Sequence, residues 1–403
     1  MPTHAIASPE QEAQIRAIIK SLAKEVSLDL HKVNNNGLLS GLAGHLLFLF
    51  NAYRLDEKNV DEVLFSDKLE LLQEQLDQQS FELSNGLAGQ AWVLEYLNQA
   101  EAEDYDPELL SEVDQLFHAA LNHQPWPGEI ESVLGLAGYA PYASRRNKQT
   151  EQAALYGVIV DNFASVALQV DDNQISWSQP ENSVYRFEKD DPKKPEYNLG
   201  LAHGVPGIIA SLIPALKIEP LREKTTRLLT QSCDWLLSQQ NPDTDSEFCY
   251  GSCSGDEHKS RLGWCYGDLT IALTLARAGH ALDRPSYVDE ARRVALKAAK
   301  RDAESGFIND AGLCHGFVGL VSIYQLLNQF MPHPELEQAA KHWLNYSLEQ
   351  YQEKGLEAFY AYNGETTEHY ENFGFLMGYA GIGLGFISVL SDDLDWAECL
   401  LMA

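Results

Sequence analysis

Apolar and charged stretches alternate along the chain. Seven short runs are apolar on nearly every side, which is expected of helices that are buried all round. These runs are HLLFLFNAYR, QAWVLEYLN, YAPYASR, IIASLIPAL, IALTLARAG, LVSIYQLLNQ and IGLGFISVL. Before each run lies a longer charged stretch with apolar residues at helical spacing. These stretches cover roughly 9–25, 58–78, 107–122, 150–169, 220–240, 284–301 and 335–354. The pattern predicts seven pairs of helices, with one amphipathic and one apolar helix in each pair.

A short glycine motif directly precedes or opens every apolar run. Six copies have the form G-x-x-G and begin at Gly41, Gly86, Gly135, Gly204, Gly316 and Gly378. A seventh copy begins at Gly267 and has Thr270 in place of the second glycine. The copies are on average about 56 residues apart, which is enough for two helices and a loop. Glycines at these positions would let the backbones of the apolar helices crowd together at one end.

We therefore expect an all-α fold, an α/α toroid in which seven outer helices surround seven inner ones. An open solenoid of helix pairs is the alternative, but the inner runs have little polar surface and form a whole number of pairs. No Ser/Gly/Pro-rich linker divides the repeats, so residues 1–403 are expected to form a single domain. The main irregularity is the segment 171–199, which is expected to be a loop with a short hairpin.

The charge of the chain limits its partners. Lys and Arg number 29 against 59 Asp and Glu, a formal net charge of −30. This balance argues against nucleic acid and anionic membranes, which attract basic surfaces, and favours cationic partners such as a basic peptide. No apolar run reaches the about 18 residues of a membrane span, and we expect no signal peptide. Six cysteines in 403 residues are few, and a reducing cytoplasm is the expected location.

Groups capable of chemistry are concentrated in the fourth, fifth and sixth copies of the motif. Just before the first glycine lie His203, Cys265 with Tyr266, and Cys314 with His315. Equivalent positions in a closed ring point to the same end of one central cavity, so these side chains are expected to converge. Two thiolates and one imidazole form a Cys₂His set, which suits Zn²⁺ and leaves a fourth position open for water or substrate. We therefore predict a zinc site at Cys265, Cys314 and His315.

Each of these assignments has a structural alternative. Cys265 and Cys314 taken singly could be small buried core residues. A rival metal site could form from residues of the segment FCYGSCSGDEH, namely Cys249, Cys253 and His258. The remaining thiols, of Cys233 and Cys399, lie in helical contexts and are expected to be packing residues.

Four further residues near the motifs carry charge or exchange protons. We expect His203 to act as an acid or base rather than as a ligand, the alternative being a structural histidine. Arg261 could place a positive charge over the site or form a surface salt bridge. Glu131 could enter the cavity as a carboxylate partner of His203 or be a solvated loop residue. Asp268, at the start of an inner helix, is expected to be structural.

With these residues in place, the sequence resembles the lanthionine synthetase C-like (LanC) cyclase family over nearly its whole length. The most specific segments are Gly200-Leu-Ala-His-Gly204, Trp264-Cys-Tyr-Gly-Asp268 and Leu313-Cys-His-Gly316. The resemblance implies a double toroid of seven inner and seven outer helices with one zinc ion at an end of the cavity. It assigns the zinc ligands to Cys265, Cys314 and His315, and the catalytic roles to His203, Arg261 and Tyr266. The bacterial cyclases usually have an aspartate where this chain has Glu131.

The resemblance also implies an activity. Members of the family add cysteine thiols of a ribosomal precursor peptide to dehydroalanine or dehydrobutyrine, closing (methyl)lanthionine thioether rings. A cytoplasmic enzyme of this kind needs a separate dehydratase, and it can work with an exporter in a membrane-associated complex. The alternatives are the addition of glutathione or another small thiol to dehydrated proteins, and a non-catalytic zinc-containing scaffold that binds peptides. A protein prenyltransferase subunit is less favoured by the motifs, and no nucleotide-binding pattern is present.

Overall fold

Every inner helix begins directly at or after the glycine motif of its repeat. The computed structural model describes residues 6–100, 104–146, 149–187, 190–191, 193–243 and 245–403. In these residues the inner helices are α2 (Leu42–Leu55), α4 (Leu87–Ala100), α6 (Ala140–Arg145), α8 (Val205–Leu212), α10 (Asp268–Ala281), α12 (Phe317–Phe330) and α14 (Tyr379–Ser391). The 3₁₀ helix η2 (Leu136–Tyr139) leads into α6, and η3 (Ile213–Lys217) continues α8. The third and fourth inner helices are thus each part α-helical and part 3₁₀-helical. Each contains a proline, Pro141 in α6 and Pro214 in η3, and proline cannot donate a helical hydrogen bond.

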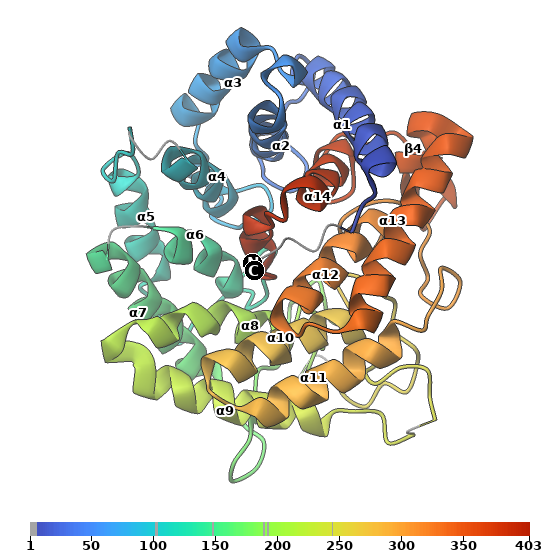
Figure 1. Ribbon diagram of the computed structural model, residues 1–403. Helices are drawn as coiled ribbons and strands as arrows, with labels where there is room; N and C mark the ends of the chain where they lie inside the picture. Colours follow the sequence, from blue (N-terminus) through green and yellow to red (C-terminus); the bar gives the residue numbers. More distant parts are fainter. Residues whose placement is uncertain (1–5, 101–103, 147–148, 188–189, 192, 244) are drawn as a thin grey trace.

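The charged stretches form the outer helices. They are α1 (Pro9–Asp29), α3 (Glu62–Glu74), α5 (Ser111–Leu121), α7 (Gln149–Val166), α9 (Arg222–Ser238), α11 (Pro285–Ala298) and α13 (Pro334–Lys354). An outer helix buries one stripe only, whereas α12 is buried at every position from Phe317 to Leu327. Figure 1 shows the seven inner helices as a ring inside the ring of outer helices. The predicted α/α toroid is therefore confirmed.

The ring is closed by backbone hydrogen bonds between neighbouring glycine loops. Six of the seven loops, all except the fourth, donate an N–H group to a carbonyl oxygen of the next loop round the ring. The bonds run from Leu39 to Ser84, Ser84 to Val133, Ser132 to Ala202, Trp264 to Cys314, Cys314 to Leu376 and Leu376 to Leu39. The last of them, 3.0 Å long, joins the final copy of the motif to the first. An open solenoid has no such contact between its ends.

The second glycine of the motif allows this close approach. A Cβ atom on Gly89 would clash with the carbonyl oxygen of Leu83 and lie 2.7 Å from Cβ of Leu38, in the preceding loop. Gly138 and Gly44 are enclosed in the same way, by Leu83 and by Phe375 respectively. Gly381 likewise meets the side chain of Leu313, so in these four copies the glycine lets an inner helix accept the neighbouring loop against its first turn.

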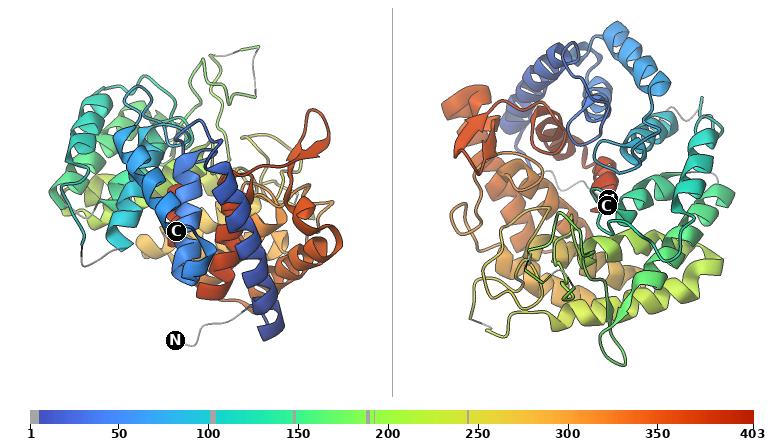
Figure 2. Two further views of the ribbon diagram at one scale, coloured as in Figure 1. Left: turned by 90° about the horizontal axis from the view of Figure 1, so that it is seen from above. Right: turned by 180° about the vertical axis from the view of Figure 1, so that it is seen from behind.

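Short hairpins and loops extend from the end of the toroid that carries the motifs. Strands β1 (Leu168–Gln169) and β2 (Ile175–Ser176) pair antiparallel, so the expected hairpin begins a few residues before 171. A second hairpin, β3 (Ala361–Asn363) with β4 (Glu368–Tyr370), was not predicted. In the left view of Figure 2, the segment after β2 and the second hairpin project on this side of the toroid. Within the described part of the chain, no helix is both long and apolar enough to cross a membrane.

The segment 395–403 lies inside the ring, where Figure 1 shows the C-terminal end of the chain. It contains the 3₁₀ helix η6 (Asp395–Leu400), in which Trp396 and Cys399 are buried. The carbonyl oxygen of Leu400 accepts a 2.8 Å hydrogen bond from the indole nitrogen of Trp264. Arg277, in α10, donates to the carbonyl oxygens of Leu401 and Ala403. This segment therefore fills the centre of the toroid and contacts the loop that precedes α10.

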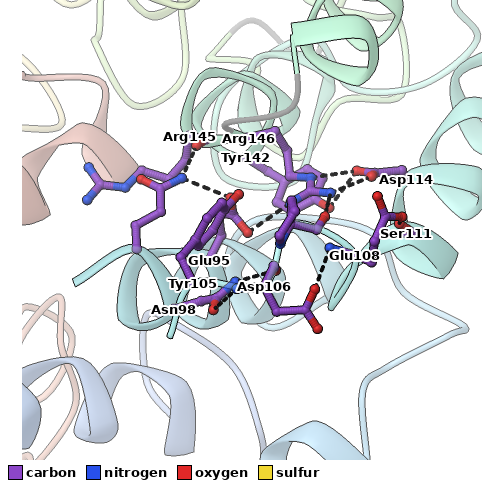
Figure 3. A network of polar contacts seen from close by, with 12 residues as sticks. Glu95, Asn98, Tyr105, Asp106, Glu108, Ser111, Asp114, Tyr142, Arg145 and Arg146 are labelled. Carbon is purple, nitrogen blue, oxygen red and sulfur yellow. Dashed lines mark hydrogen bonds and ion pairs between the residues drawn. The ribbon is translucent and has the colours of Figure 1, made fainter. Parts of the chain in front are cut away.

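A buried ionic network joins α4, α5 and α6 (Figure 3). The guanidinium of Arg146 is fully buried and lies 2.9 Å from the carboxylate of Glu95 and 2.8 Å from that of Asp114. Tyr142 and Tyr105 donate further hydrogen bonds to these two carboxylates. Since all the charges are paired, the network fixes the third repeat, whose inner α-helix has only six residues.

We expect Gly89→Ala to destabilise the protein by about 1–3 kcal/mol, because the new methyl group overpacks the contact between neighbouring repeats. Gly157→Ala, in the outer helix α7, is the matched control, since a Cβ atom there has no heavy atom within 4 Å. That change should stabilise by roughly 0.5–1 kcal/mol through the unfolded chain. Urea unfolding of both variants measures the difference, and equal midpoints would contradict the close approach.

We expect Arg146→Met to destabilise by roughly 3–5 kcal/mol, because Glu95 and Asp114 would stay buried without their cation. Arg292→Met removes an exposed ion pair with Asp289 in α11 and should change stability by about 1 kcal/mol or less. Thermal unfolding followed by circular dichroism compares the two variants. A similar loss of stability for both would show that the network contributes no more than a surface pair.

Candidate metal centre and active site

Two adjacent loops bring the sulfur ligands together. Cys265 lies in the loop before α10, and Cys314 and His315 lie in the turn before α12. The N–H group of Trp264 donates to the carbonyl oxygen of Cys314 over 2.6 Å. Gly263 permits this approach, because a Cβ atom there would lie 2.7 Å from that oxygen and 2.9 Å from Cβ of His315. The bond that links the fifth and sixth repeats therefore also fixes the spacing of the cysteines.

The donor atoms of Cys265, Cys314 and His315 lie within 4.8 Å of one another. This is the one cluster of His, Cys, Asp and Glu donors with such spacing in the part of the chain that the structure describes. Both cysteines are buried, and Nδ1 of His315 is buried without a hydrogen-bond partner. A buried nitrogen lone pair or N–H group with no partner is costly, and coordination would satisfy it. The residues present therefore fit a borderline-soft ion such as zinc.

Asp310 supports the histidine of this cluster. Its side chain is buried, and its Oδ2 lies 3.8 Å from Nε2 of His315. The same oxygen accepts a hydrogen bond from the N–H group of Tyr362 in β3, and Oδ1 accepts one from Gly312. A carboxylate behind a ligating imidazole orients the ring and makes the nitrogen more basic. The unexpected second hairpin thus helps to hold Asp310 beside His315.

The thiols of Cys265 and Cys314 interact, and their pKa values are shifted in opposite directions. The pKa of Cys265 lies well below the usual range of a thiol, chiefly because Cys314 donates a hydrogen bond to its sulfur, with further contributions from His315 and Arg261. The pKa of Cys314 is raised, because it donates this bond to the Cys265 sulfur and because it is buried. Two thiols that share one proton beside an imidazole form an arrangement that favours a bound cation.

His203 and Glu131 form a hydrogen-bonded pair. The imidazole Nδ1 lies 3.0 Å from Oε2 of Glu131, whose side chain is fully buried. The carboxylate also accepts hydrogen bonds from the N–H groups of Val133 and Leu134, of 2.8 and 2.5 Å. Since a carboxylate only accepts, Nδ1 donates in this bond, which leaves Nε2 as the basic nitrogen of the neutral ring. The alternative of a solvated loop carboxylate at Glu131 is wrong.

Tyr266 and Arg261 lie in the same loop as Cys265, before α10. The hydroxyl oxygen of Tyr266 accepts a 2.9 Å hydrogen bond from the side-chain amide of Asn198, and its ring centroid lies 6.0 Å from that of His203. Burial raises the pKa of Tyr266, so the phenol stays protonated and can donate. The guanidinium of Arg261 makes no hydrogen bond or ion pair with any residue that the structure describes. Arg261 lowers the pKa of both ligand cysteines through its positive charge.

The rival cluster does not assemble. The side chain of His258 is 96% exposed and bonds to Asp256, while Cys249 is buried elsewhere in that loop. Asp268 is buried and accepts hydrogen bonds from the N–H groups of Cys249 and Tyr250, which agrees with a structural role. Cys233 and Cys399 are also buried, in α9 and η6.

A polar residue that the motif pattern did not include stands six residues before the first glycine of each copy. This position holds Asn35, Ser80, Glu129, Asn198, Arg261, Asp310 and Asn372. In six copies, the carbonyl oxygen at this position accepts a hydrogen bond from the first residue of the inner helix or of η2. Asn35, Asn198, Asp310 and Asn372 also accept from the N–H group two residues on, which forms a compact turn. This spacing in the sequence would have identified Asp310 and Asn198.

Comparisons with known proteins match this chain in fold, and the matches cover most of its length. The model of the family described as lanthionine synthetase C-like protein matches residues 32–401. The nisin biosynthesis protein NisC of Lactococcus lactis subsp. lactis is 23% identical over 317 residues, covering 73% of this chain and 74% of that protein. A solved structure of nisin cyclase superposes with a TM-score of 0.73 at 19% identity, covering 96% of this chain and 98% of the other.

Cys314→Ala should abolish stoichiometric zinc binding, because two protein ligands remain and the soft donor set is broken. Cys253→Ala, in the loop of the rival cluster, should keep one zinc per chain. Elemental analysis after purification, with circular dichroism to confirm folding, compares the two variants. One equivalent of zinc in folded Cys314→Ala would contradict the site.

Proposed function

This chain belongs to the lanthionine synthetase C-like family, and on that basis we propose that it is a zinc-dependent lanthipeptide cyclase. It would add cysteine thiols of a dehydrated precursor peptide to dehydroalanine or dehydrobutyrine, closing thioether rings. One observation carries the proposal: the Cys265, Cys314 and His315 donors cluster on loops adjoining those of the His203–Glu131 pair and Tyr266. A thiol site beside a proton-transfer pair is what this addition requires.

Cys265, Cys314 and His315 would hold the zinc ion and leave one coordination position for the substrate. When bound, zinc lowers the pKa of a substrate thiol and stabilises the thiolate near neutral pH. Asp310 would orient His315 for this purpose.

His203 would transfer the proton of the reaction. The new C–S bond forms at Cβ of the dehydroamino acid, and the electrons of the double bond move to Cα as an enolate. Nε2 of His203 is the nitrogen able to accept the thiol proton and return it to Cα, so the addition needs no net proton. Glu131 accepts the Nδ1 hydrogen bond and would stabilise the imidazolium between the two transfers.

Arg261 and Tyr266 would stabilise the enolate. The guanidinium of Arg261 has no hydrogen-bond or ion-pair partner among the described residues, so its donors are free for a substrate carbonyl. The protonated phenol of Tyr266 is a second donor, because its oxygen is held by Asn198 while its O–H group is not used in that bond. Charged and neutral donors aimed at a developing oxyanion lower the barrier to its formation.

The proposal includes the surroundings of the enzyme. A separate dehydratase would supply the peptide, an exporter would remove the product, and the cyclase would work in the cytoplasm, in peripheral contact with a membrane-associated complex. The net charge of −30 favours a basic peptide as substrate.

Wild-type protein with zinc should remove free thiols from a dehydrated peptide without changing its mass, because ring closure is an isomerisation. His203→Ala should lower kcat by roughly 10²–10⁴-fold, as expected for loss of acid–base catalysis, while keeping its zinc. His258→Ala is the control, since His258 is exposed and outside the cluster. Mass spectrometry after alkylation counts the remaining thiols.

A cysteine-free version of the peptide, incubated with glutathione, separates the two chemistries. We expect no adduct with this peptide. Glutathione adducts without ring closure in the cysteine-containing peptide would replace the cyclase with a small-thiol transferase. Equal activity of His203→Ala and wild type would favour a scaffold that binds peptides.

A further inference from the structure

The chain of backbone hydrogen bonds round the ring has one interruption. Among the described residues, no backbone bond joins the motif segment 198–204, which carries His203, to the motif segment 261–267, which carries Cys265. The fourth loop instead pairs with an earlier part of the connection between α9 and α10, where Leu199 donates to the carbonyl oxygen of Ser252 and Ser254 donates to that of Tyr197. Two other contacts span this step. Asn198 donates to the Tyr266 hydroxyl, and Gly200 packs against the carbonyl of Cys265, where a Cβ atom would clash. The spacing of His203 from the thiol cluster is therefore not set by the backbone bond used elsewhere.

The segment 183–187 lies across this interruption. The N–H group of Val184 donates to Oε1 of Glu129 over 3.3 Å, in the third loop. The ring of Tyr185 stacks on the imidazole of His203, with centroids 3.8 Å apart and planes 20° from parallel. Phe187 meets the ring of Tyr266 edge to face at 5.9 Å. One short segment thus contacts residues of the third, fourth and fifth copies.

Internal hydrogen bonds brace this segment. Arg186 is only 4% exposed, and its guanidinium donates to the carbonyl oxygens of Gln179 and Lys194 over 3.0 and 2.9 Å. The N–H group of Phe187 donates to the carboxylate of Glu196, and the side chain of Gln179 donates to the carbonyl oxygen of His203. Arg186 therefore holds the loop from inside while its neighbours Tyr185 and Phe187 contact the two aromatic residues of the site.

The stack of Tyr185 on His203 restricts a rotation of the imidazole that its hydrogen bond to Glu131 still allows. A single hydrogen bond from Nδ1 to Glu131 fixes one point of the imidazole, and the ring can still turn about that bond. Contact with a parallel ring fixes its plane, and together the two contacts determine where Nε2 points. Proton transfer is sensitive to this direction, since small misplacements of a catalytic group can cost up to about 10²-fold in rate.

We propose that Tyr185 is a positioning residue, which holds the imidazole of His203 in the orientation needed for proton transfer between the peptide thiol and Cα. The inference rests on the proposed function for its catalytic consequence, but the stacking itself can be tested independently. The stacking needs the flat aromatic ring of Tyr185 and not its hydroxyl, so a phenylalanine at position 185 should position His203 equally well.

The test compares Tyr185→Phe and Tyr185→Leu in the full chain with zinc. Tyr185→Phe should keep kcat within about twofold of wild type, and Tyr185→Leu should lower kcat about 10–100-fold with little change in KM. Tyr53→Leu is the control, because Tyr53 lies in the last turn of α2, away from the glycine loop at which that helix begins. Equal losses for Phe and Leu at position 185, or full activity of Tyr185→Leu, would overturn the proposal.

Nuclear magnetic resonance gives a readout that needs no activity. A stacked ring shifts the imidazole protons of His203 upfield, and a His203→Gln spectrum identifies them. We expect Tyr185→Phe to retain this shift and Tyr185→Leu to lose it, with zinc content and unfolding midpoint unchanged in both. An unchanged His203 spectrum in Tyr185→Leu would overturn the positioning role. If wild type closed no rings but the shifts behaved as expected, the proposed function would fail and the stack would stand.

Discussion

The series of backbone hydrogen bonds between the glycine loops, which joins six of the seven neighbouring pairs, is the constraint on which the rest of the structure depends. Its bonds join residues two or three positions before the first glycine in neighbouring repeats, so these loops are held together at one end of the toroid. The glycine motif fits this geometry, because in four copies a side chain at the second glycine would collide with the neighbouring loop. Residues far apart in the chain, such as Cys265 and Cys314, become neighbours only through this series of bonds.

The scaffold and the chemistry use different parts of each repeat. Helices supply the buried surface, whereas the proposed ligands and proton-transfer groups all lie in the residues just before an inner helix. There the backbone is irregular, and its polar groups are satisfied by turns and by carbonyls of the neighbouring loop. Side chains such as Glu131 are fixed by two backbone N–H groups as well as by their partner. A rigid scaffold with functional loops at one end is a common solution in enzymes.

Much of this architecture could be predicted from the sequence because it repeats. The apolar runs gave the inner helices, and the register of the glycines brought Cys265, Cys314 and His315 to one place. The register could not predict contacts made by insertions, so the Tyr185 stack and the hairpin behind Asp310 were missed. These contacts depend on how an irregular segment folds back over the ring, which no periodic pattern encodes. The alternative metal site at Cys249, Cys253 and His258 shows that short spacing along a loop is not enough, since its side chains do not come together.

The contact between the Trp264 indole and the carbonyl of Leu400 has a consequence for how the molecule assembles. Residues 395–403 occupy the middle of the ring, so the loop of Cys265 gains one of its supports only when this segment has docked there. The loop of the first repeat likewise forms this bond only with the seventh repeat, since Leu39 accepts its hydrogen bond from Leu376. Contacts of such long sequence separation form slowly, because a large loop must be closed before they contribute. On the ribosome, a nascent chain that lacks the seventh repeat would therefore have an open edge between the loops of its first and sixth repeats.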